Sequence, residues 1–343
     1  MHWLSETFVV DSRPSYPFRV GGNRYTPKIG TSASSPKRIE RHVSLIFLHS
    51  IGMFKETFEP VIEVLFKAYP VIQSHSGKSL IIDEVWSIEC PNHGQSTVLN
   101  ASEIQKQNDK DWSSMEYATA AHVYIHGKPG GHDISKRRIV LIGQSNGAEI
   151  IPFLTQMEPK LEFHSIILGV PVTSPACPER ELVGQTFAAL MLARRTVWAD
   201  QEEARKYFER NPFTRTWPAE ARELYVKYGL RERTDSKGVT LACSKEHQAS
   251  IGMTIAQDDK GYDLLAALYA SETPVHYLYD DDPHPLLIKF HPGMLLCKGF
   301  KPTSAHSVRG GHMFFQANPA YSAELIANAL SHDQKTVTAT ARL

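Results

Sequence analysis

The sequence predicts an α/β protein with a mostly parallel central sheet flanked by helices. Apolar, β-prone runs alternate with helical patterns along most of the 343 residues, and such alternation is typical of parallel strands joined by helices. One strand-like run leads through a Gly-x-Ser-x-Gly segment directly into a helical pattern. The alternation stops between Leu168 and Val275, which indicates an insertion.

The expected elements follow in order from local periodicity. Opening strands are expected at 5–10 and 16–25, and a buried strand at Val43–His49. The later strands are expected at Glu84–Glu89, Ile139–Ile142, Ser165–Leu168 and Val275–Tyr279, and the helices at Phe58–Tyr69, Trp112–His126, after the serine motif, and Tyr321–Leu330.

The insertion is predicted to be a mainly helical cap. Residues 176–261 are charged, aromatic and mostly helical in pattern, as expected of a lid above an active site. Residues 1–175 and 262–334 would then form the two parts of the core, and 335–343 a polar, flexible tail.

Ser145 is the candidate nucleophile. Gly143 and Gly147 flank it at two residues on either side, and small residues there allow a sharp strand-to-helix turn that exposes the hydroxyl. A chance match with a structural turn serine is the alternative. The flanking strand and helix favour a nucleophile elbow, and with it an α/β-hydrolase fold.

The base and acid are sought later in the chain, because this fold uses the order Ser, Asp, His. His312 lies in a late Gly-Gly-His loop before a helix and is the candidate base. Asp282 is the favoured acid because it precedes a proline after the Val275–Tyr279 strand, with Asp280 and Asp281 as alternates. All three aspartates could instead form a solvated turn.

Two backbone N–H groups are expected to form the oxyanion hole. Asn146, which follows the serine, supplies one. The second should come from the loop after the Val43–Leu48 strand, where Ile51 is favoured and Ser50 is the alternative. His49 and His93 are interpreted as structural.

Composition excludes several function classes. Thirty-seven basic residues balance 37 acidic ones, so nothing favours nucleic acid as a partner. The four cysteines lack paired spacing, which argues against zinc and against a disulfide framework. No apolar run approaches the ~20 residues of a membrane span. We expect a soluble intracellular protein without a metal or organic cofactor.

The tail carries a candidate address. Ala341-Arg342-Leu343 has the small-basic-leucine form of a peroxisomal signal, in a polar segment accessible to an import receptor. Peroxisomal localisation is therefore expected, with a chance tail and a cytoplasmic protein as the alternative.

Several short segments in shared order resemble fungal α/β-hydrolases of the toxin-biosynthesis and peroxisomal acyl-CoA hydrolase type. They span roughly residues 20–330 and comprise Tyr25-Thr26-Pro27-Lys28, Leu45–Met53, Asn92-His93-Gly94-Gln95-Ser96, Gly143–Gly147, Arg194-Arg195-Thr196-Val197-Trp198, Tyr225–Leu230 and Gly238-Val239-Thr240-Leu241. The resemblance implies a capped Ser-His-Asp hydrolase of acyl-CoA thioesters or related esters in lipid or secondary metabolism, and it allows a homodimer.

The chain departs from that family at one position. Members place the acid directly after the strand that follows the elbow helix, where this chain has Val170. This departure and the uncertain acid leave open a non-catalytic protein with a relic elbow. A carboxylesterase or lipase, and a carbon–carbon hydrolase or lyase, also stay open as alternatives, because the same fold hosts these reactions. If coenzyme A is the leaving group, its phosphates should meet basic cap residues, unless these are ordinary surface charges. The candidates are Arg194, Arg195, Arg205 and Lys206.

Overall fold

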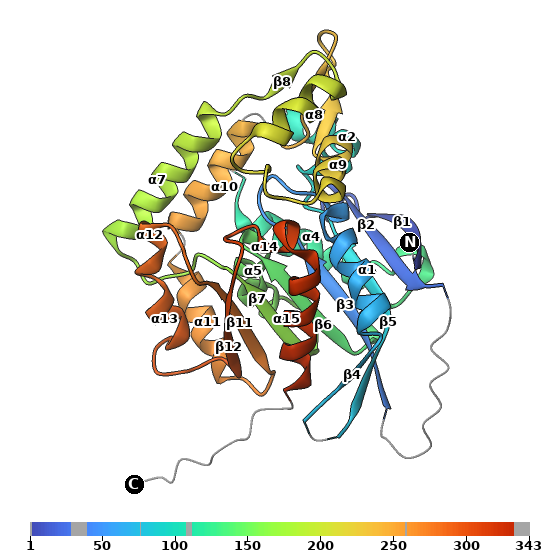
Figure 1. Ribbon diagram of the computed structural model, residues 1–343, viewed down its shortest axis with the longest axis vertical. Coiled ribbons are helices and arrows are strands. Elements are labelled where there is room, and N and C mark those ends of the chain that lie inside the picture. Colours follow the sequence, from blue (N-terminus) through green and yellow to red (C-terminus); the bar gives the residue numbers. More distant parts are fainter. Residues whose placement is uncertain (1, 29–39, 76, 108–111, 258, 333–343) are drawn as a thin grey trace.

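A central sheet flanked by helices, with a smaller layer above it, makes up the described part of the chain (Figure 1). The computed structural model describes residues 2–28, 40–75, 77–107, 112–257 and 259–332. The nine strands of the sheet follow the order β1-β2-β5-β3-β6-β7-β11-β12, with β4 paired to β5. The first strands pair antiparallel, and β5 through β12 along this order are parallel.

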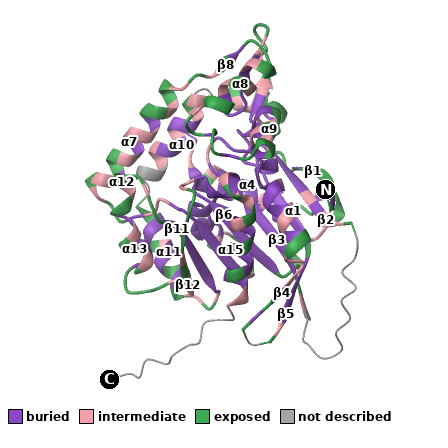
Figure 2. Ribbon diagram, in the orientation of Figure 1, coloured by how far each residue is buried: buried purple, intermediate pink, exposed green. Residues whose placement is uncertain are grey.

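The strand bounds are β1 Trp3–Asp11, β2 Arg19–Pro27, β3 Glu40–Leu48, β4 Val71–Gln73, β5 Ser79–Ile88, β6 Ile139–Gln144, β7 Phe163–Gly169, β11 Val275–Asp280 and β12 Ser304–Val308. The central strands are apolar on both faces because both faces are covered. In β6, Ile139 and Leu141 join the core cluster on one face, and Val140 and Ile142 join the cluster on the other. Figure 2 shows the resulting buried sheet beneath half-buried helices.

Helices cover both faces of the sheet. On one face lie α1 (Glu59–Ala68), α14 (Phe314–Ala317) and α15 (Pro319–Ser331), and the other carries α4 (Ser114–His126) and α11 (Lys260–Ala270). The shorter helices are α2 (Gly94–Leu99), α3 (Ala101–Lys106), α5 (Asn146–Glu149), α6 (Ile151–Leu154), α12 (Pro285–Ile288) and α13 (His291–Leu295).

The segment between β7 and α11 forms the upper layer (Figure 1). It contains α7 (Pro178–Ala193), β8 (Val197–Trp198), α8 (Gln201–Arg210), α9 (Ala219–Tyr228), β9 (Leu230–Glu232), β10 (Val239–Leu241) and α10 (Lys245–Gln257). The three strands form a small antiparallel sheet. Strands of two or three residues leave no period in the sequence, which is why only helices were expected there.

An aromatic cluster joins this layer to the core. The cluster contains Trp198, Phe208, Trp217 and Tyr225, and Phe54 of the core belongs to it as well.

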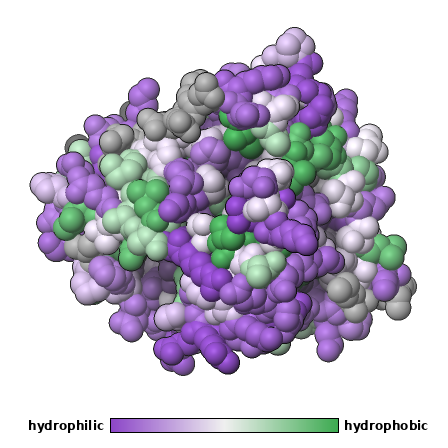
Figure 3. All heavy atoms as spheres, turned by 90° about the horizontal axis from the view of Figure 1, so that it is seen from above, coloured by the Kyte–Doolittle hydropathy of each residue, from purple (hydrophilic) through white to green (hydrophobic). Residues whose placement is uncertain are grey.

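Viewed from above, the surface of this side carries separate hydrophobic patches in a mostly hydrophilic face (Figure 3).

The predicted fold class is confirmed. The expected strands and helices recur with ends shifted by a few residues, and β12, whose Ser-Ala-His-Ser-Val sequence has no apolar run, is an additional strand. No helix within the described ranges is both long enough and apolar enough to cross a bilayer.

Candidate active site

Ser145 lies at a sharp turn between β6 and α5. Its backbone has φ 52° and ψ −120°, a strained conformation for a residue other than glycine. Its N–H donates to the carbonyl oxygen of Gly169 at 2.8 Å, which anchors the turn to the neighbouring strand. Because the carboxyl ends of parallel strands meet at one edge of a sheet, this turn places the hydroxyl where loops from other strands converge.

The two glycines of the motif are required by close backbone packing. A Cβ at Gly143 would lie 2.3 Å from the carbonyl oxygen of Gly147, and a Cβ at Gly147 would lie 2.2 Å from the carbonyl oxygen of Leu48. Neither neighbour is a flexible side chain. The turn is therefore built around the absence of side chains at both positions, as a nucleophile elbow requires.

His312 is brought to Ser145 from a sequence distance of 167 residues. Its Nε2 lies 2.8 Å from the serine Oγ, within hydrogen-bonding distance. The loop that carries it follows β12 and contains Gly310 and Gly311, whose φ angles of 109° and 74° suit glycine. Burial lowers the pKa of His312 to about 4, which keeps the imidazole neutral and able to accept the serine proton near neutral pH.

Gln144, which precedes Ser145, holds the backbone of the histidine loop. Its Nε2 donates to the carbonyl oxygen of His312 at 3.2 Å and to Oε1 of Gln316 at 3.0 Å. Gln316 donates back to Oε1 of Gln144 at 3.0 Å and also to Oγ1 of Thr57 at 3.0 Å. Sequence reasoning missed this buried amide pair, because its two members are far apart in the chain.

The three consecutive aspartates have different environments. Asp280 ends β11 and is buried, whereas Asp281 and Asp282 are exposed. A Cβ at Gly311 would lie 4.0 Å from Oδ2 of Asp280, so this carboxylate lies beneath the loop that carries His312. Asp282, favoured from the sequence, instead contributes its N–H, which donates to Oδ1 of Asp280 at 3.1 Å.

Asp280 and His312 also line one small cavity, together with Val170 and His291. Burial raises the pKa of Asp280, and the charges of Asp281 and Asp282 act in the same direction. No hydrogen bond joins any of the three carboxylates to His312 in the described part of the chain. Asp280 is nevertheless the aspartate that lies next to the histidine loop.

Val170 occupies the position directly after β7 where the resembled family has its acid. It is buried, with φ 45°, an unusual conformation for a β-branched residue. Its N–H donates to the carbonyl oxygen of Leu278 at 2.8 Å. An apolar side chain therefore stands at this position, and the carboxylate that lines the same small cavity as Val170 and His312 is that of Asp280 at the end of β11.

Two backbone N–H groups beside Ser145 have no acceptor in the described part of the chain. Asn146 begins α5, and Ile51 lies in the loop after β3 and lines the same cavity as Ser145 and His312. Among the described residues, neither N–H has a hydrogen-bond acceptor. Free N–H groups at such positions are what an oxyanion hole needs.

Buried histidines support the Ile51 loop. Nε2 of His93 accepts from the N–H of Gly52 at 2.9 Å, and Nε2 of His49 accepts from the N–H of Cys90 at 3.0 Å. Burial lowers the pKa of both histidines, that of His49 to about 4. Both are therefore neutral, and their hydrogen bonds fix the loop rather than serve as a second base.

A mainly apolar cavity of about 170 Å³ adjoins Ser145 and His312. Its walls come from the elbow, the Ile51 loop, α7, α10 and α12, and its lining includes Ile51, Val172, Val183, Gly184, Phe187, Gly252 and Leu287. A comparable engineered cavity of roughly 150 Å³ holds benzene. The space therefore suits an acyl group of about six heavy atoms.

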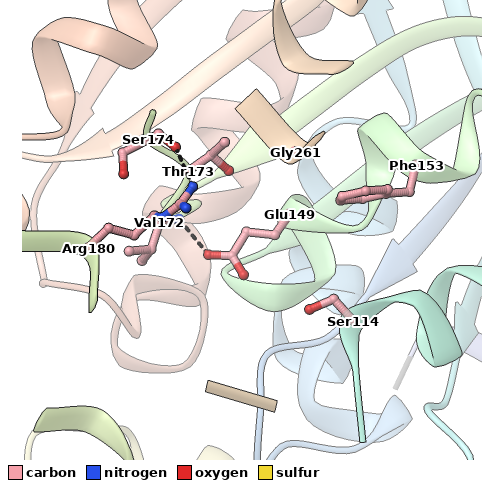
Figure 4. Close-up of a pocket in the computed structure, with 8 residues that line it drawn as sticks. All are labelled: Ser114, Glu149, Phe153, Val172, Thr173, Ser174, Arg180 and Gly261. Carbon is pink, nitrogen blue, oxygen red and sulfur yellow. Dashed lines mark hydrogen bonds between the residues drawn. The ribbon is translucent and has the colours of Figure 1, made fainter. Parts of the chain in front are cut away.

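Two charged residues that line this cavity, Glu149 and Arg180, escaped sequence reasoning. Glu149, one helical turn after Ser145, is buried and lines both this cavity and a smaller one beside it (Figure 4). Its position four residues after the nucleophile was the available signal, but an acid on an expected helix is usually exposed.

The basic cap residues do not gather at the cavity. Arg194 is bound to Gln248 and Tyr225, both at 3.0 Å. The others pair with surface glutamates: Arg195 with Glu203 at 2.6 Å, Arg205 with Glu202 and with Glu223 at 2.7 Å, and Lys206 with Glu202 at 3.5 Å.

In the parts of the chain that are described, no group of three or more His, Cys, Asp or Glu is arranged to hold a metal ion.

Comparisons with known proteins support the fold. No protein-family model matches the sequence, and no curated protein matches it. Among solved structures, the peroxisomal α/β-hydrolase Lpx1 from Saccharomyces cerevisiae is 18% identical, with a TM-score of 0.71 over 96% of this chain and 89% of that one. E-2-(acetamidomethylene)succinate hydrolase is 16% identical, with a TM-score of 0.65 over 96% and 99%.

A thioesterase domain from the curacin biosynthetic pathway is 15% identical, with a TM-score of 0.60 over 94% of this chain and 99% of that one. At these identities the likeness concerns the arrangement of the chain. It does not extend to substrates.

Proposed function

We propose that this chain, which has the α/β-hydrolase fold, is a serine hydrolase that cleaves an acyl thioester or ester. The observation that carries the proposal is the 2.8 Å contact between Nε2 of His312 and Oγ of Ser145 at a strained elbow. The acceptor-free N–H groups of Ile51 and Asn146 support it, because the charge that develops on an attacked carbonyl oxygen needs such donors.

The proposed reaction has two halves. His312 accepts the proton of Ser145 as Oγ attacks the acyl carbonyl, and the two N–H groups stabilise the oxyanion. Collapse of the tetrahedral intermediate expels the thiol or alcohol, which takes the proton from His312, and leaves an acyl-enzyme. Water, activated by His312, then attacks the acyl-enzyme and releases the acid.

Asp280 is the proposed acid of the triad. Its carboxylate lies beneath the histidine loop and is buried, so its charge would act on the imidazolium through little solvent. Asp281 and Asp282 are exposed, so solvent would screen the effect of their charges on the imidazolium. In the proposed reaction, a hydrogen bond from Nδ1 of His312 to Asp280 would hold the tautomer needed for catalysis.

The leading substrate class is an acyl-CoA thioester. The cavity accepts a compact acyl group, and the resembled family acts on such thioesters. One of the structural neighbours is itself a thioesterase domain. Carboxylesters form the second class, favoured by one observation: the four basic cap residues are bound to other side chains rather than presented to a phosphate.

Peroxisomal import through Ala341-Arg342-Leu343 is part of the proposal. These residues lie outside the described ranges, so its support comes from the sequence and from the peroxisomal character of the structural neighbour Lpx1. A fluorescent fusion should enter peroxisomes, and the same fusion without these three residues should not. Entry of the shortened fusion would contradict the assignment.

The function is tested by thiol release from short, long and aromatic acyl-CoAs, with nitrophenyl esters of the same acids in parallel. Turnover by wild type that disappears in Ser145→Ala supports serine hydrolysis, and the preferred leaving group decides between thioesterase and esterase. Labelling of Ser145 by a fluorophosphonate without turnover of either class would favour carbon–carbon bond chemistry. Neither labelling nor turnover would leave a non-catalytic role.

A further inference from the structure

Glu149 is a buried acid within the substrate cavity that the proposed reaction does not use. It lies on α5, one turn after Ser145, and only 6% of its surface is exposed. Oε1 accepts a hydrogen bond from the N–H of Val172 at 2.6 Å. Oε2 is buried and has no hydrogen-bond partner among the described residues.

Within the described ranges, no basic side chain forms an ion pair with this carboxylate. Arg180 lines the same cavity, but its guanidinium donates to the carbonyl oxygen of Ser174 at 3.0 Å (Figure 4). It is also bound to Asp259. Burial raises the pKa of Glu149 to about 7, and the Val172 N–H offsets only part of this effect. An ionised carboxylate with one unpaired oxygen in an apolar cavity is destabilising unless a partner arrives.

The hydrogen bond from the Val172 N–H does not explain why a glutamate occupies position 149. An amide oxygen at this position would accept the Val172 N–H equally well without carrying a carboxylate into an apolar cavity. Glu149 lines both the cavity beside Ser145 and a side cavity of about 20 Å³, which is large enough for about one water. The side cavity is also lined by Ser114, Thr173 and Ser174, so the carboxylate marks a polar end of an otherwise apolar space (Figure 4).

We propose that Glu149 selects acyl groups that carry a hydrogen-bond donor, a hydroxyl or an amino group, a few bonds from the scissile carbonyl. This inference rests on the proposed function, since Ser145 must be the acyl acceptor. The N–H of Glu149 donates to the carbonyl oxygen of Ser145 at 2.9 Å, which sets the two residues about one helical turn, roughly 5 Å, apart. A donor bound to Oε2 would therefore lie about two to four carbons beyond the carbonyl carbon, and a plain hydrocarbon chain would leave Oε2 unpaired.

The test separates this selectivity from hydrolysis. Methyl ketones with a terminal methyl, hydroxyl or ammonium group at the same position imitate the acyl part of the substrate but cannot be hydrolysed. Their concentrations for half-protection of Ser145 against a fluorophosphonate are measured in wild type, Glu149→Gln and Glu149→Met. Thioesters of the matching acids are assayed in parallel.

In wild type, we expect one chain length at which the hydroxyl or ammonium ketone half-protects Ser145 at a concentration about ten- to a hundredfold lower than the methyl ketone. This ratio is the one expected for a hydrogen bond to a charged group. Glu149→Met should remove or reverse this preference. Glu149→Gln should keep a preference for hydroxyl and lose one for ammonium. Val183→Ala, which alters the cavity wall without its charge, should shift all three ketones alike.

Equal protection by the three ketones at every position in wild type would overturn the inference. So would the same preference in Glu149→Met. If Glu149→Met does not fold, the inference is tested by pH in wild type. The preference for the ammonium ketone over the methyl ketone must then fall as the pH drops below about 7, and a preference that stays constant with pH would refute the inference. Selective protection without hydrolysis of any ester or thioester would instead refute the proposed function and leave the selectivity of Glu149 standing.

Discussion

Replacement of Gly147 by alanine should damage both stability and catalysis. The added Cβ would lie 2.2 Å and 2.5 Å from the carbonyl oxygen and carbon of Leu48, and 2.8 Å from the carbonyl oxygen of His49. Ordinary contacts need about 3.5 Å, so the end of β3 must move by about 1 Å. This backbone is held by strands on both sides, and we expect a loss of about 3 kcal/mol in the free energy of unfolding.

The same movement would displace the loop that supplies the Ile51 N–H. A shift of about 1 Å at a catalytic group can reduce the rate by roughly a hundredfold. Urea unfolding followed by tryptophan fluorescence gives the stability of Gly147→Ala, and the labelling rate of Ser145 by a fluorophosphonate gives the integrity of the site.

Gly261→Ala is the matched control. Gly261 lies in α11, and its added Cβ would meet ring atoms of Phe153 at 3.5 Å, an ordinary contact. Since alanine is a better helix former, this variant should gain about 0.5 kcal/mol. The reasoning is refuted if Gly147→Ala unfolds within about 1 kcal/mol of wild type and labels at the wild-type rate.

Three further predictions concern charge. Asp280→Asn should lower kcat by about 10³–10⁴-fold, whereas Asp282→Asn, at an exposed site, should change kcat by no more than about twofold. A steady-state assay in which Asp282→Asn is the more damaged variant would identify Asp282 as the acid. Because burial lowers the pKa of His312 to about 4, kcat/KM should stay constant as the pH is lowered to about 5. A decrease in kcat/KM with a midpoint near pH 6.5 would instead show that a carboxylate already stabilises the imidazolium in the free enzyme. Burial raises the pKa of Glu149 from 4.5 to about 7, so the folded state binds this proton more tightly than the unfolded chain and stability falls as the pH rises between these values. Glu149→Gln should therefore gain up to about 3 kcal/mol on wild type from pH 4.5 to pH 8 in urea titrations, and a constant difference would contradict the assigned burial.

The sequence allowed prediction of those parts of the site that depend on local patterns. A strand, a Gly-x-Ser-x-Gly turn and a helix are contiguous, so Ser145 and Asn146 could be named together. Chain order and a glycine-rich loop were sufficient to name His312, and the end of an apolar strand pointed to Ile51.

The choice among the three aspartates depends on a finer detail. Asp280 is the last residue of β11 and is buried, whereas the next two aspartates follow the strand and are exposed. A strand end is uncertain by a residue or two in any sequence pattern, and here one residue separates a buried carboxylate from a solvated one. Glu149 was missed for a related reason: its burial comes from Val172, α7 and α10, which are remote in sequence.

The reciprocal pair of Gln144 and Gln316 constrains how such a site can change over evolutionary time. Each amide is both donor and acceptor to the other, and each also donates to a second partner, the His312 carbonyl oxygen or the Thr57 hydroxyl. A carboxylate or an apolar side chain at one position alone would leave a buried group at the other unpaired. In descendants of this chain, positions 144 and 316 should therefore be inherited or replaced together, whereas the wall provided by α7 can diverge freely and supply new substrate preferences.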